Sequence, residues 1–343
     1  MKPLPDLPDG IRFDPNVAQP LRLLELCPAY APSQLRIVPK PGGGALMLKD
    51  ETERMGLGAF KALGGVYAVA RLIGERWDET HEGPIDYTSS ALRDLAASLT
   101  FVCASAGNHG MAVAAGARIF GAAARIHLAA TVPESFAARL EAKGARVVRS
   151  GATYEEGLAA AEADAAATGA ILLADGSWVD YIHPPSLVME GYTVIAEELR
   201  KMFVASGTWP TAVYLQAGVG GLAAAMAHMI RLNWDQQPRI VVVEPEAAPC
   251  LKESIAAGRP VRVGGPVSAM GRLDCKEPSL LALATLRRCA DAFVLVSEAE
   301  AEAATEYAAT LGFTTTPSGT AGLAAALRDT GEQSLVILSE GSV

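Results

Sequence analysis

Short apolar runs alternate along the chain with longer, alanine-rich stretches, and this alternation constrains the fold more than any other feature. Several runs are apolar on both faces, which is typical of parallel strands covered by helices. We expect strands at 46–49, 100–105, 125–130, 146–151, 171–175, 212–218, 239–245, 292–297 and 335–341. We expect helices between them, among them 111–120, 135–144, 154–169 and 298–312. Repeated strand–helix units predict an α/β fold with mostly parallel sheets.

The length of the chain predicts two domains, because 343 residues exceed the usual size of one. The strands are also many for a single sheet, and their spacing tightens between about residues 100 and 175. A smaller α/β domain inserted into a larger one explains both observations. We expect a large domain from residues 1–75 and 190–343, a small domain from residues 76–189, and a ligand site in the cleft between them. The Pro-rich first 30 residues predict an irregular arm.

Composition argues against several classes of protein. A net charge of −9 argues against nucleic acid as a main partner, since phosphate binding needs a basic surface. No apolar run reaches the roughly 20 residues of a membrane span, and the start MKPLPDLPDG has no signal-peptide core. The five cysteines are scattered, which argues against a disulfide framework, and no CxxC or HxxxH pair suggests a metal site. These features predict a soluble, cytoplasmic enzyme.

The segment LQAGVGGLAAAMAHMI (215–230) joins an apolar strand to an alanine-rich helix through a glycine-rich turn. Backbone N–H groups converging at a helix N-terminus form a site for a phosphate. The segment lacks the lysine and Ser/Thr of a P-loop and the spacing of GxGxxG, so neither ATP nor a dinucleotide is favoured. A tight turn without a ligand is the alternative.

The segment CASAGNHGMAVA (103–114) is a second strand, turn and helix. Ser105, Gly107, Asn108 and His109 lie at the carboxyl end of the strand, which is the usual ligand edge of an open α/β sheet. The backbone of this turn is suited to a carboxylate, and the Asn108 amide to a ring oxygen. The alternative is that Asn108 and His109 only cap the helix.

Two further segments carry candidate groups. In GAFKALGG (58–65), Lys61 lies among apolar neighbours, which lowers the pKa of an amine and suits it to form a Schiff base with an aldehyde. An ordinary helix lysine that reaches water is the alternative. In TTTPSGTAGLAAAL (314–327), Ser318 is a candidate hydrogen-bonding group at a pocket floor, or else Ser318 or Thr320 is a helix N-cap.

The order of GAFKALGG, SAGNHG, QAGVGG and PSGTAG resembles the fold-type II pyridoxal-phosphate enzymes, the tryptophan synthase β-like group. The resemblance runs from about residue 46 to the C-terminus and implies two domains, each a mostly parallel sheet flanked by helices. The likeness is greatest to diaminopropionate ammonia-lyase. It lies in KDETERMGLGAFKALGG (49–65), MEGYTVIAEEL (189–199), LQAGVGGLA (215–223), VVEPEAAPCLKES (242–254) and MGRLDCKEPS (270–279).

The resemblance implies pyridoxal 5′-phosphate as the cofactor and assigns roles to matching positions. Lys61 would form the Schiff base, Phe60 would lie on a ring face, and Asn108 would meet the 3′-oxygen. Ser318 would meet the ring nitrogen. The phosphate would be held by Gly218, Val219, Gly220, Gly221 and Leu222. The substrate carboxylate would be held by Ser105, Ala106, Gly107, Asn108 and His109.

The implied reaction is α,β-elimination on a small amino acid similar to 2,3-diaminopropionate, giving a 2-oxo acid (pyruvate) and ammonia. A neutral serine at the ring nitrogen makes the cofactor a weaker electron sink, which suits elimination better than transamination. Lys61, once displaced by the substrate amine, is one candidate base for the Cα proton. Asp175 in LADGSW (173–178) is the other, because it matches an active-site aspartate of the ammonia-lyases. Its alternative role is to cap a helix or turn.

Two departures from the family keep the substrate open. Ammonia-lyases that take both stereoisomers have an aspartate where this chain has Ala106, so activity on D-substrates is an open point. Arg272 and Asp274 stand where the family is less charged; Arg272 either binds a second substrate carboxylate or pairs with Asp274 at the surface. A serine/threonine or hydroxyaspartate dehydratase is therefore the alternative enzyme, and a non-catalytic ligand-binding protein is the alternative from another class. The resemblance also implies a homodimer.

Overall fold

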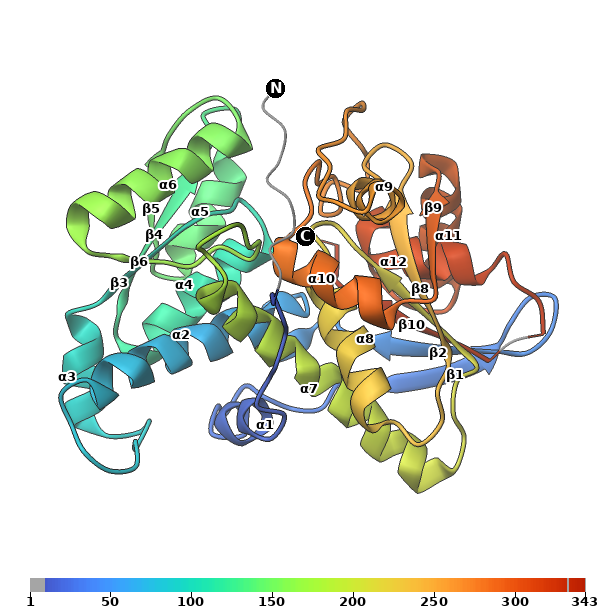
Figure 1. Ribbon diagram of the computed structural model, residues 1–343, viewed down its shortest axis with the longest axis horizontal. Coiled ribbons are helices and arrows are strands. Elements are labelled where there is room, and N and C mark those ends of the chain that lie inside the picture. Colours follow the sequence, from blue (N-terminus) through green and yellow to red (C-terminus); the bar gives the residue numbers. More distant parts are fainter. Residues whose placement is uncertain (1–9, 332, 343) are drawn as a thin grey trace. The chain divides into compact units, whose positions relative to one another are not determined.

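The computed structural model describes residues 10–331 and 333–342, which contain two β-sheets with helices around each (Figure 1). The six-stranded sheet consists of β1 (Leu35–Pro39), β2 (Ala45–Asp50), β7 (Ala212–Gln216), β8 (Arg239–Pro245), β9 (Ala292–Val296) and β10 (Gln333–Leu338). The four-stranded sheet consists of β3 (Thr100–Ala104), β4 (Ala123–Leu128), β5 (Arg146–Arg149) and β6 (Ile171–Leu172). All neighbouring pairs named in the two sheets are parallel except β1 with β2. The predicted α/β class with mostly parallel sheets is confirmed.

The chain forms two compact units, which we call unit 1 and unit 2. Unit 1 comprises the described residues up to Phe60, Gly176–Ile182 and the described residues from Tyr192 onward; unit 2 comprises Lys61–Asp175 and His183–Gly191. The predicted division into domains at residues 75 and 190 stays a prediction.

The six-stranded sheet belongs to unit 1, in the order β1-β2-β10-β7-β8-β9. Its inner strands are buried along their length; β7, for example, has no exposed residue. The helices of this unit are α1 (Gln19–Leu24), the 3₁₀ turn η1 (Arg54–Gly56), α8 (Gly221–Asn233), α9 (Cys250–Ala257), α10 (Leu280–Cys289), α11 (Glu298–Thr310) and α12 (Pro317–Ala326). Helix α12 packs on β7, β8, β9 and β10, and its alanines form part of the core with Leu48, Val241 and Val336.

The four-stranded sheet belongs to unit 2, in the order β5-β4-β3-β6. Its helices are α2 (Lys61–Asp78), α3 (Ser90–Ala97), α4 (Asn108–Phe120), α5 (Glu134–Ala142) and α6 (Tyr154–Thr168). Helix α4 packs on β3 and β4, and α6 packs on β3, β4 and β6. Helix α7 (His183–Ser206) contributes residues up to Gly191 to unit 2 and its remaining residues to unit 1.

Small residues allow α2 to approach two other helices of unit 2 closely. A Cβ on Gly65 would lie 2.5 Å from Ala112 Cβ of α4, and a Cβ on Gly191 of α7 would lie 2.7 Å from Gly64 Cα. Real Cβ atoms do not tolerate such distances, so the backbones can meet only where these residues lack side chains. Close helix packing therefore explains the glycines that follow Lys61 in GAFKALGG.

Helix ends follow the expected side-chain and glycine signals. Thr153 caps α6 by accepting a hydrogen bond from Glu156 N at 3.2 Å, and Ser297 forms a capping box with Glu300 at the start of α11. Gly169 ends α6 with a φ of 72°, in the left-handed region where glycine avoids the strain of a side chain.

Some elements differ from the sequence predictions. Strand β1 was not predicted; it is a partly exposed edge strand that ends in Pro39, and so it lacks a continuous apolar run. The predicted irregular arm contains the helix α1, with Pro20 near its first turn, and residues 1–9 lie outside the described residues. The predicted strand 335–341 is displaced, since β10 ends at Leu338 and the residues after it form only isolated bridges.

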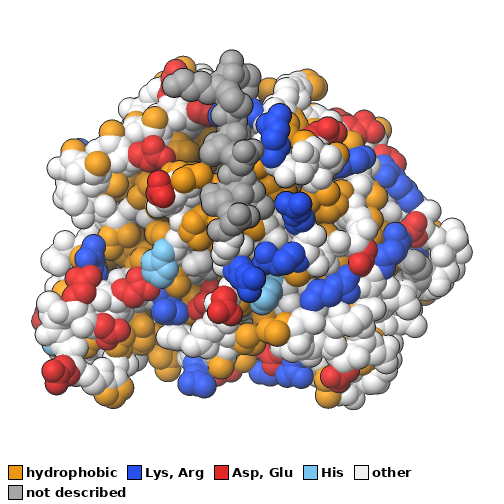
Figure 2. Space-filling view, viewed as in Figure 1, with side chains coloured by type: hydrophobic (Ala, Val, Ile, Leu, Met, Phe, Trp, Pro, Cys, Tyr) orange, Lys and Arg blue, Asp and Glu red, His pale blue; other side chains and the backbone are white. Residues whose placement is uncertain are grey.

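The surface carries charges of both signs. On the face shown in Figure 2, basic and acidic side chains lie interspersed among apolar ones. The five cysteines are free thiols. Within residues 10–331 and 333–342, no helix combines the length and the apolar character that a membrane span requires.

Candidate active site

In unit 2, the order of the strands reverses between β3 and β6. The chain runs from β3 to β4 and β5, and then returns through α6 to place β6 on the other side of β3. Loops that leave the carboxyl ends of two such strands diverge, and open α/β sheets bind ligands at this switch point. The turn Ser105–Gly107 follows β3, and Asp175 follows β6, with Leu173 N bonded to Val102 O at 2.8 Å. The fold therefore brings the two sequence-predicted groups of unit 2 to one edge of its sheet.

Lys61 and Asp175 form an ion pair at this edge. Lys61 is the first residue of α2, and its Nζ donates a hydrogen bond to Asp175 Oδ2. Both side chains are about one-fifth exposed, at 21% and 19%. Burial by itself would raise the pKa of Asp175, but the charge and the hydrogen bond of Lys61 hold that pKa well below its ordinary value. Asp175 is therefore a charged carboxylate, and it binds the amine of Lys61.

The turn after β3 folds tightly onto the start of α4. Gly107 N donates to Ser105 Oγ at 3.3 Å, and a Cβ on Gly110 would overlap Ser105 O. The N-cap residue of α4 is Gly107, so the alternative that Asn108 and His109 are the caps is wrong. Asn108 is instead the first residue of the helix, with 7% of its surface exposed, and Ala106 lies in the turn before it.

His109 is buried beside the ion pair. Its Nε2 lies 2.8 Å from Leu173 O, and its Nδ1 is buried without a hydrogen-bond partner among the described residues. Burial lowers the pKa of His109, and the Lys61 charge adds to this effect. A neutral ring that donates from Nε2 to Leu173 O leaves Nδ1 as an acceptor, so His109 supports the turn without adding charge.

In unit 1, the order of the strands reverses between β7 and β10. The chain runs from β7 to β8 and β9, and then returns through α11 and α12 to place β10 on the other side of β7. The turn Gly218–Gly220 follows β7 and leads into α8. The predicted glycine-rich turn therefore lies at the second switch point of the molecule.

The turn leads into a helix start and leaves no room for a side chain at Gly218 or Gly220. Gly220 has a φ of 102°, and the first bond of α8 is from Ala224 N to Gly220 O at 2.9 Å. The N–H groups of Gly221 and Leu222 precede that bond and have no acceptor within the helix. A Cβ on Gly218 would lie 2.9 Å from Cys275 Sγ, and one on Gly220 would lie 3.1 Å from Leu251. A glycine turn whose N–H groups lie at a helix N-terminus fits a phosphate group.

Ser318 lies in the first turn of α12, close to the loop that contains Arg272. The N-cap of α12 is Thr316, which accepts a hydrogen bond from Gly319 N, so the prediction that Ser318 or Thr320 is the cap is wrong. Ser318 is buried, and its Oγ accepts a hydrogen bond from Arg272 N at 3.1 Å. A hydroxyl that accepts this bond keeps its own proton to donate.

Arg272 and Asp274, for which the sequence left a substrate contact or a mutual ion pair open, each form an ion pair with another residue. Arg272 Nε lies 3.7 Å from Glu340 Oε2, while Lys276 Nζ lies 2.5 Å from Asp274 Oδ1. Within unit 1, Ser318 therefore binds the backbone of Arg272, and Glu340 binds its side chain.

Two buried polar residues that the sequence did not indicate, Ser339 and Glu340, follow β10. Ser339 Oγ accepts a hydrogen bond from Gln216 Nε2 at 3.0 Å, and Glu340 Oε1 accepts one from Thr316 Oγ1 at 2.7 Å. Both residues are 4% exposed. Their position just past an apolar strand was the available signal, but the predicted strand 335–341 included both residues.

Phe60 is fixed by its backbone and by its ring. Phe60 N donates to Ser339 O at 3.1 Å, and its ring meets that of Tyr192 edge to face, with centroids 4.9 Å apart. The residue before Lys61 is thus held in unit 1 by Ser339, which follows β10, and by Tyr192 of α7.

Comparisons with known proteins identify the family of the chain. A family model described as "Pyridoxal-phosphate dependent enzyme" matches residues 28–338. The diaminopropionate ammonia-lyase of Escherichia coli (strain K12) is 31% identical over 252 residues, which cover 73% of this chain and 63% of the relative. A serine dehydratase-like protein of Mus musculus is 31% identical over 209 residues, covering 60% of this chain and 59% of that protein. The chain thus spans less than two thirds of the length of these curated relatives.

A solved structure shows the same fold over nearly the whole chain. The crystal structure of diaminopropionate ammonia lyase from Escherichia coli in complex with D-serine superimposes with a TM-score of 0.82 at 25% identity, covering 98% of this chain and 93% of that one. The crystal structure of a threonine deaminase from T.th. superimposes with a TM-score of 0.76 at 25% identity, covering 95% of this chain and 98% of the other.

Proposed function

Because the chain belongs to the family of pyridoxal-phosphate dependent enzymes, we propose that it is an ammonia-lyase which removes ammonia from a small amino acid by α,β-elimination. The proposed substrate resembles 2,3-diaminopropionate, and the products are pyruvate and ammonia. The observation that carries the proposal is the ion pair between Lys61 and Asp175 at the switch point of unit 2, where an amine is held beside a carboxylate. The family's cofactor is pyridoxal 5′-phosphate, and its ring, when bound, stabilises the electrons that the Cα–H bond leaves behind.

The residues of the chain divide the work of holding the cofactor. Lys61 supplies the amine that bonds to the aldehyde. The phosphate is held by the backbone of Gly218, Val219, Gly220, Gly221 and Leu222, where added Cβ atoms at the first and third positions would crowd their neighbours. The Asn108 amide donates to the ring oxygen, the Ser318 hydroxyl donates its remaining proton to the ring nitrogen, and Phe60 covers one ring face.

The turn after β3 binds the substrate. The proposed carboxylate site consists of Ser105, Ala106 and Gly107 in the turn and of Asn108 and His109 at the start of α4, because the N-terminus of a helix favours an anion. The Cα proton passes to Lys61 Nζ or to Asp175 Oδ2, since both atoms lie at the same edge of the unit 2 sheet. The low pKa of Asp175 keeps its carboxylate ionised at neutral pH but makes it a weak base, while Lys61 must first lose its own proton.

A substrate panel tests this function. Purified protein loaded with pyridoxal 5′-phosphate is assayed with L- and D-2,3-diaminopropionate, L-serine, L-threonine and 3-hydroxyaspartate, and 2-oxo acid and ammonia are measured together. We expect the highest kcat/KM for L-2,3-diaminopropionate, and a lower value for its D-isomer because Ala106 has no carboxylate. No product from the L-diamine would contradict the proposed substrate.

A dehydratase is the second candidate, favoured by Ala106 in the turn SAGNH and by the similarity to a serine dehydratase-like protein. In that case serine, threonine or 3-hydroxyaspartate gives the highest kcat/KM in the same panel. A protein that forms no product from any of these amino acids would instead be a ligand-binding protein of the same fold.

We also propose that the protein acts in the cytoplasm as a homodimer. The five free cysteines support a reducing compartment, where thiols stay unpaired. The dimer is supported by the family resemblance. Light scattering on the purified protein tests it, and a mass equal to the 35.7 kDa of a single chain would contradict it.

A further inference from the structure

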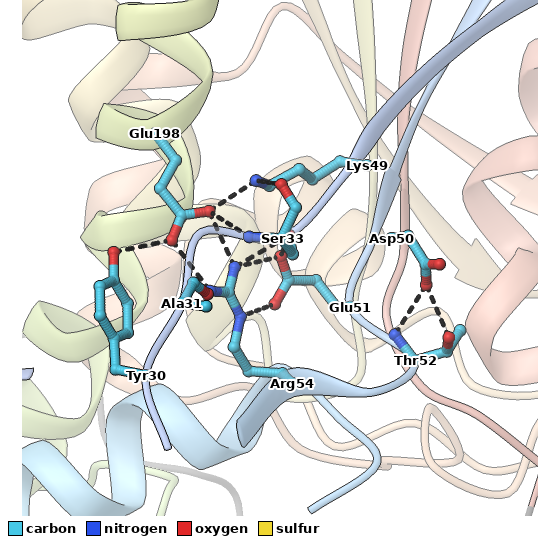
Figure 3. Close-up of polar contacts among 9 residues, drawn as sticks. All are labelled: Tyr30, Ala31, Ser33, Lys49, Asp50, Glu51, Thr52, Arg54 and Glu198. Carbon is cyan, nitrogen blue, oxygen red and sulfur yellow. Dashed lines mark hydrogen bonds and ion pairs between the residues drawn. The ribbon is translucent and has the colours of Figure 1, made fainter. Parts of the chain in front are cut away.

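Unit 1 contains a buried network of four charged side chains that the proposed function does not use. The network, which we call the Arg54 network, consists of Lys49, Glu51, Arg54 and Glu198 (Figure 3). Their exposed fractions are 0%, 0%, 3% and 5%. Two cations and two carboxylates leave the network without net charge, which makes its burial possible.

Arg54 bonds to both carboxylates through its planar guanidinium group. Arg54 Nε and Nη2 each lie 2.6 Å from an oxygen of Glu51, and Nη1 and Nη2 each lie 2.9 Å from an oxygen of Glu198. Lys49 Nζ lies 2.5 Å from Glu198 Oε2. Burial would raise the pKa of Glu198, but the hydrogen bonds and charges of Arg54 and Lys49 outweigh it and lower that pKa. A fork geometry of this kind fixes both the position and the orientation of Arg54.

The arm before β1 completes the network. Tyr30 Oη donates to Glu198 Oε1 at 2.9 Å, Ser33 Oγ donates to Glu51 Oε1 at 2.6 Å, and Arg54 Nη1 donates to Ala31 O at 2.8 Å. Figure 3 shows these groups converging on Arg54 from the arm, from β2 and from α7. Every carboxylate of the network therefore has several donors.

Stability alone does not account for such a network. Desolvation of buried ions offsets much of their attraction, and apolar side chains of similar volume often give equal stability. The chain immediately after Arg54 points to another role. Met55 has a φ of 53°, in the left-handed region that a side chain makes unfavourable, and Gly56 and Gly58 have φ values of 65° and 78°. The network thus anchors the start of a strained segment.

The far end of the same segment is anchored as well. Gly341 N donates to Gly58 O at 2.9 Å, and Phe60 N donates to Ser339 O at 3.1 Å. Helix α7 takes part at both ends, because it carries Glu198, which binds Arg54, and Tyr192, whose ring contacts Phe60. The next residue in the chain is Lys61.

We propose that Arg54 is a positioning residue: with Glu51 and Glu198 it holds residues 55–60 in one strained conformation and so sets the backbone from which Lys61 projects. The proposal rests on the proposed function, in which Lys61 bonds to the cofactor aldehyde. A reacting amine displaced by about 1 Å loses up to about a hundredfold in rate, so the conformation of this segment controls how fast Lys61 reacts.

Two variants test the proposal, and neither alters the candidate active site. Glu198→Gln keeps the shape of the side chain but removes a charge from Arg54. Met55→Gly removes the strain and lets the segment adopt other conformations, while the network itself stays intact. The matched control is Asp329→Asn, which removes a charge from the ion pair with Arg239 elsewhere in unit 1.

The readout is the rate at which protein free of cofactor captures pyridoxal 5′-phosphate on Lys61, followed by absorbance and by borohydride trapping with peptide mass analysis. Tm is measured in parallel. We expect the rate of cofactor capture by both variants to be lower than that of wild type by a factor of about ten or more. We expect Met55→Gly to keep a Tm near wild type, and Asp329→Asn to capture at the wild-type rate whatever its Tm.

Capture at the wild-type rate by the folded variants would overturn the proposal and leave the network a purely stabilising role. If Glu198→Gln does not fold, Met55→Gly decides. A wild-type protein that captures no cofactor on Lys61 would instead overturn the proposed function, so the two failures are distinguishable.

Discussion

The two switch points of the molecule use different kinds of polar group. In unit 2 the groups are side chains, among them the charged pair Lys61 and Asp175. In unit 1 they are the backbone N–H groups of the turn after β7, together with the side chains of Ser318, Ser339 and Glu340. Side chains can exchange protons with a substrate, whereas a rigid backbone cradle can only hold a group in place. Under the proposed function, unit 2 supplies the reacting groups and unit 1 the groups that hold the phosphate, and we call the two switch points the reacting edge and the holding edge.

The largest effect is expected at the reacting edge. Asp175→Asn removes the charge that binds Lys61 Nζ, and we expect kcat to fall by about 10² to 10⁴. The matched control is Asp164→Asn, which breaks the ion pair with Arg125 elsewhere in unit 2. Steady-state kinetics on the preferred substrate measure both variants. Equal kcat values for Asp175→Asn and wild type would place the reacting groups elsewhere.

A smaller effect, of a different kind, is expected at the holding edge. Gly220→Ala puts a Cβ on a residue with a φ of 102° and within 3.1 Å of Leu251, so the turn must shift. We expect the affinity for pyridoxal 5′-phosphate to fall about tenfold, since left-handed strain costs about 1–2 kcal/mol. Fluorescence titration of protein free of cofactor measures the Kd.

The control for this change is Gly207→Ala at the end of α7, where φ is 69° and no neighbour lies within 4 Å of the added Cβ. It carries similar strain without touching the turn, so we expect a lower Tm and an unchanged Kd. Equal loss of affinity in both variants would remove the distinction between the two edges.

The packing that supports Lys61 gives the next effect. Gly65→Ala places a Cβ 2.5 Å from Ala112 Cβ, and we expect a loss of about 1–3 kcal/mol in the free energy of unfolding. Gly157→Ala in α6 is the matched control, because its nearest neighbour would be at an ordinary 3.7 Å. Urea denaturation should show that this control is as stable as wild type or more so.

The smallest effect is the pH dependence of stability that Glu244 of unit 1 contributes. Glu244 accepts hydrogen bonds from Leu251 N and Lys252 N, but burial outweighs them and raises its pKa from 4.5 to about 7. A carboxyl group with a raised pKa stabilises the fold at low pH, and this contribution is lost as pH rises from about 4.5 through about 7. Between about pH 6 and 8 we expect a loss of about 1 kcal/mol.

Glu244→Gln should abolish this loss, because an amide does not titrate. Urea denaturation at the two pH values measures the difference for each protein. A wild-type protein whose stability is constant over this range would contradict the raised pKa.

The sequence predicted the repeated strands and helices well, since apolar runs and glycine stops are local signals. It missed β1, because a half-exposed edge strand that ends in Pro39 has no continuous apolar run. It also missed Ser339 and Glu340, whose place at a switch point depends on β10 lying beside β7 in the sheet. That pairing joins segments more than a hundred residues apart, and no local pattern encodes it.

In the candidate site, too, local features could be predicted from the sequence, whereas contacts between distant segments could not. The turns at Gly218–Gly220 and Ser105–Gly107 are predictable as anion-binding turns, because a strand, glycines and a helix start are consecutive in the sequence. The pairing of Lys61 with Asp175 spans 114 positions, so it follows from the fold and not from either segment alone. The cap of α12 was misassigned because Thr316, Ser318 and Thr320 are all good caps, and only the backbone distinguishes them.

The central claim is that Lys61 is the amine which bonds to the cofactor aldehyde. Borohydride reduction of wild-type protein with pyridoxal 5′-phosphate, followed by peptide mapping, tests it directly, with Lys61→Ala as the comparison. We predict one modified peptide, with the added mass on Lys61, and no modification at an equivalent level in the variant. Modification of another lysine, or equal modification of both proteins, would contradict the account.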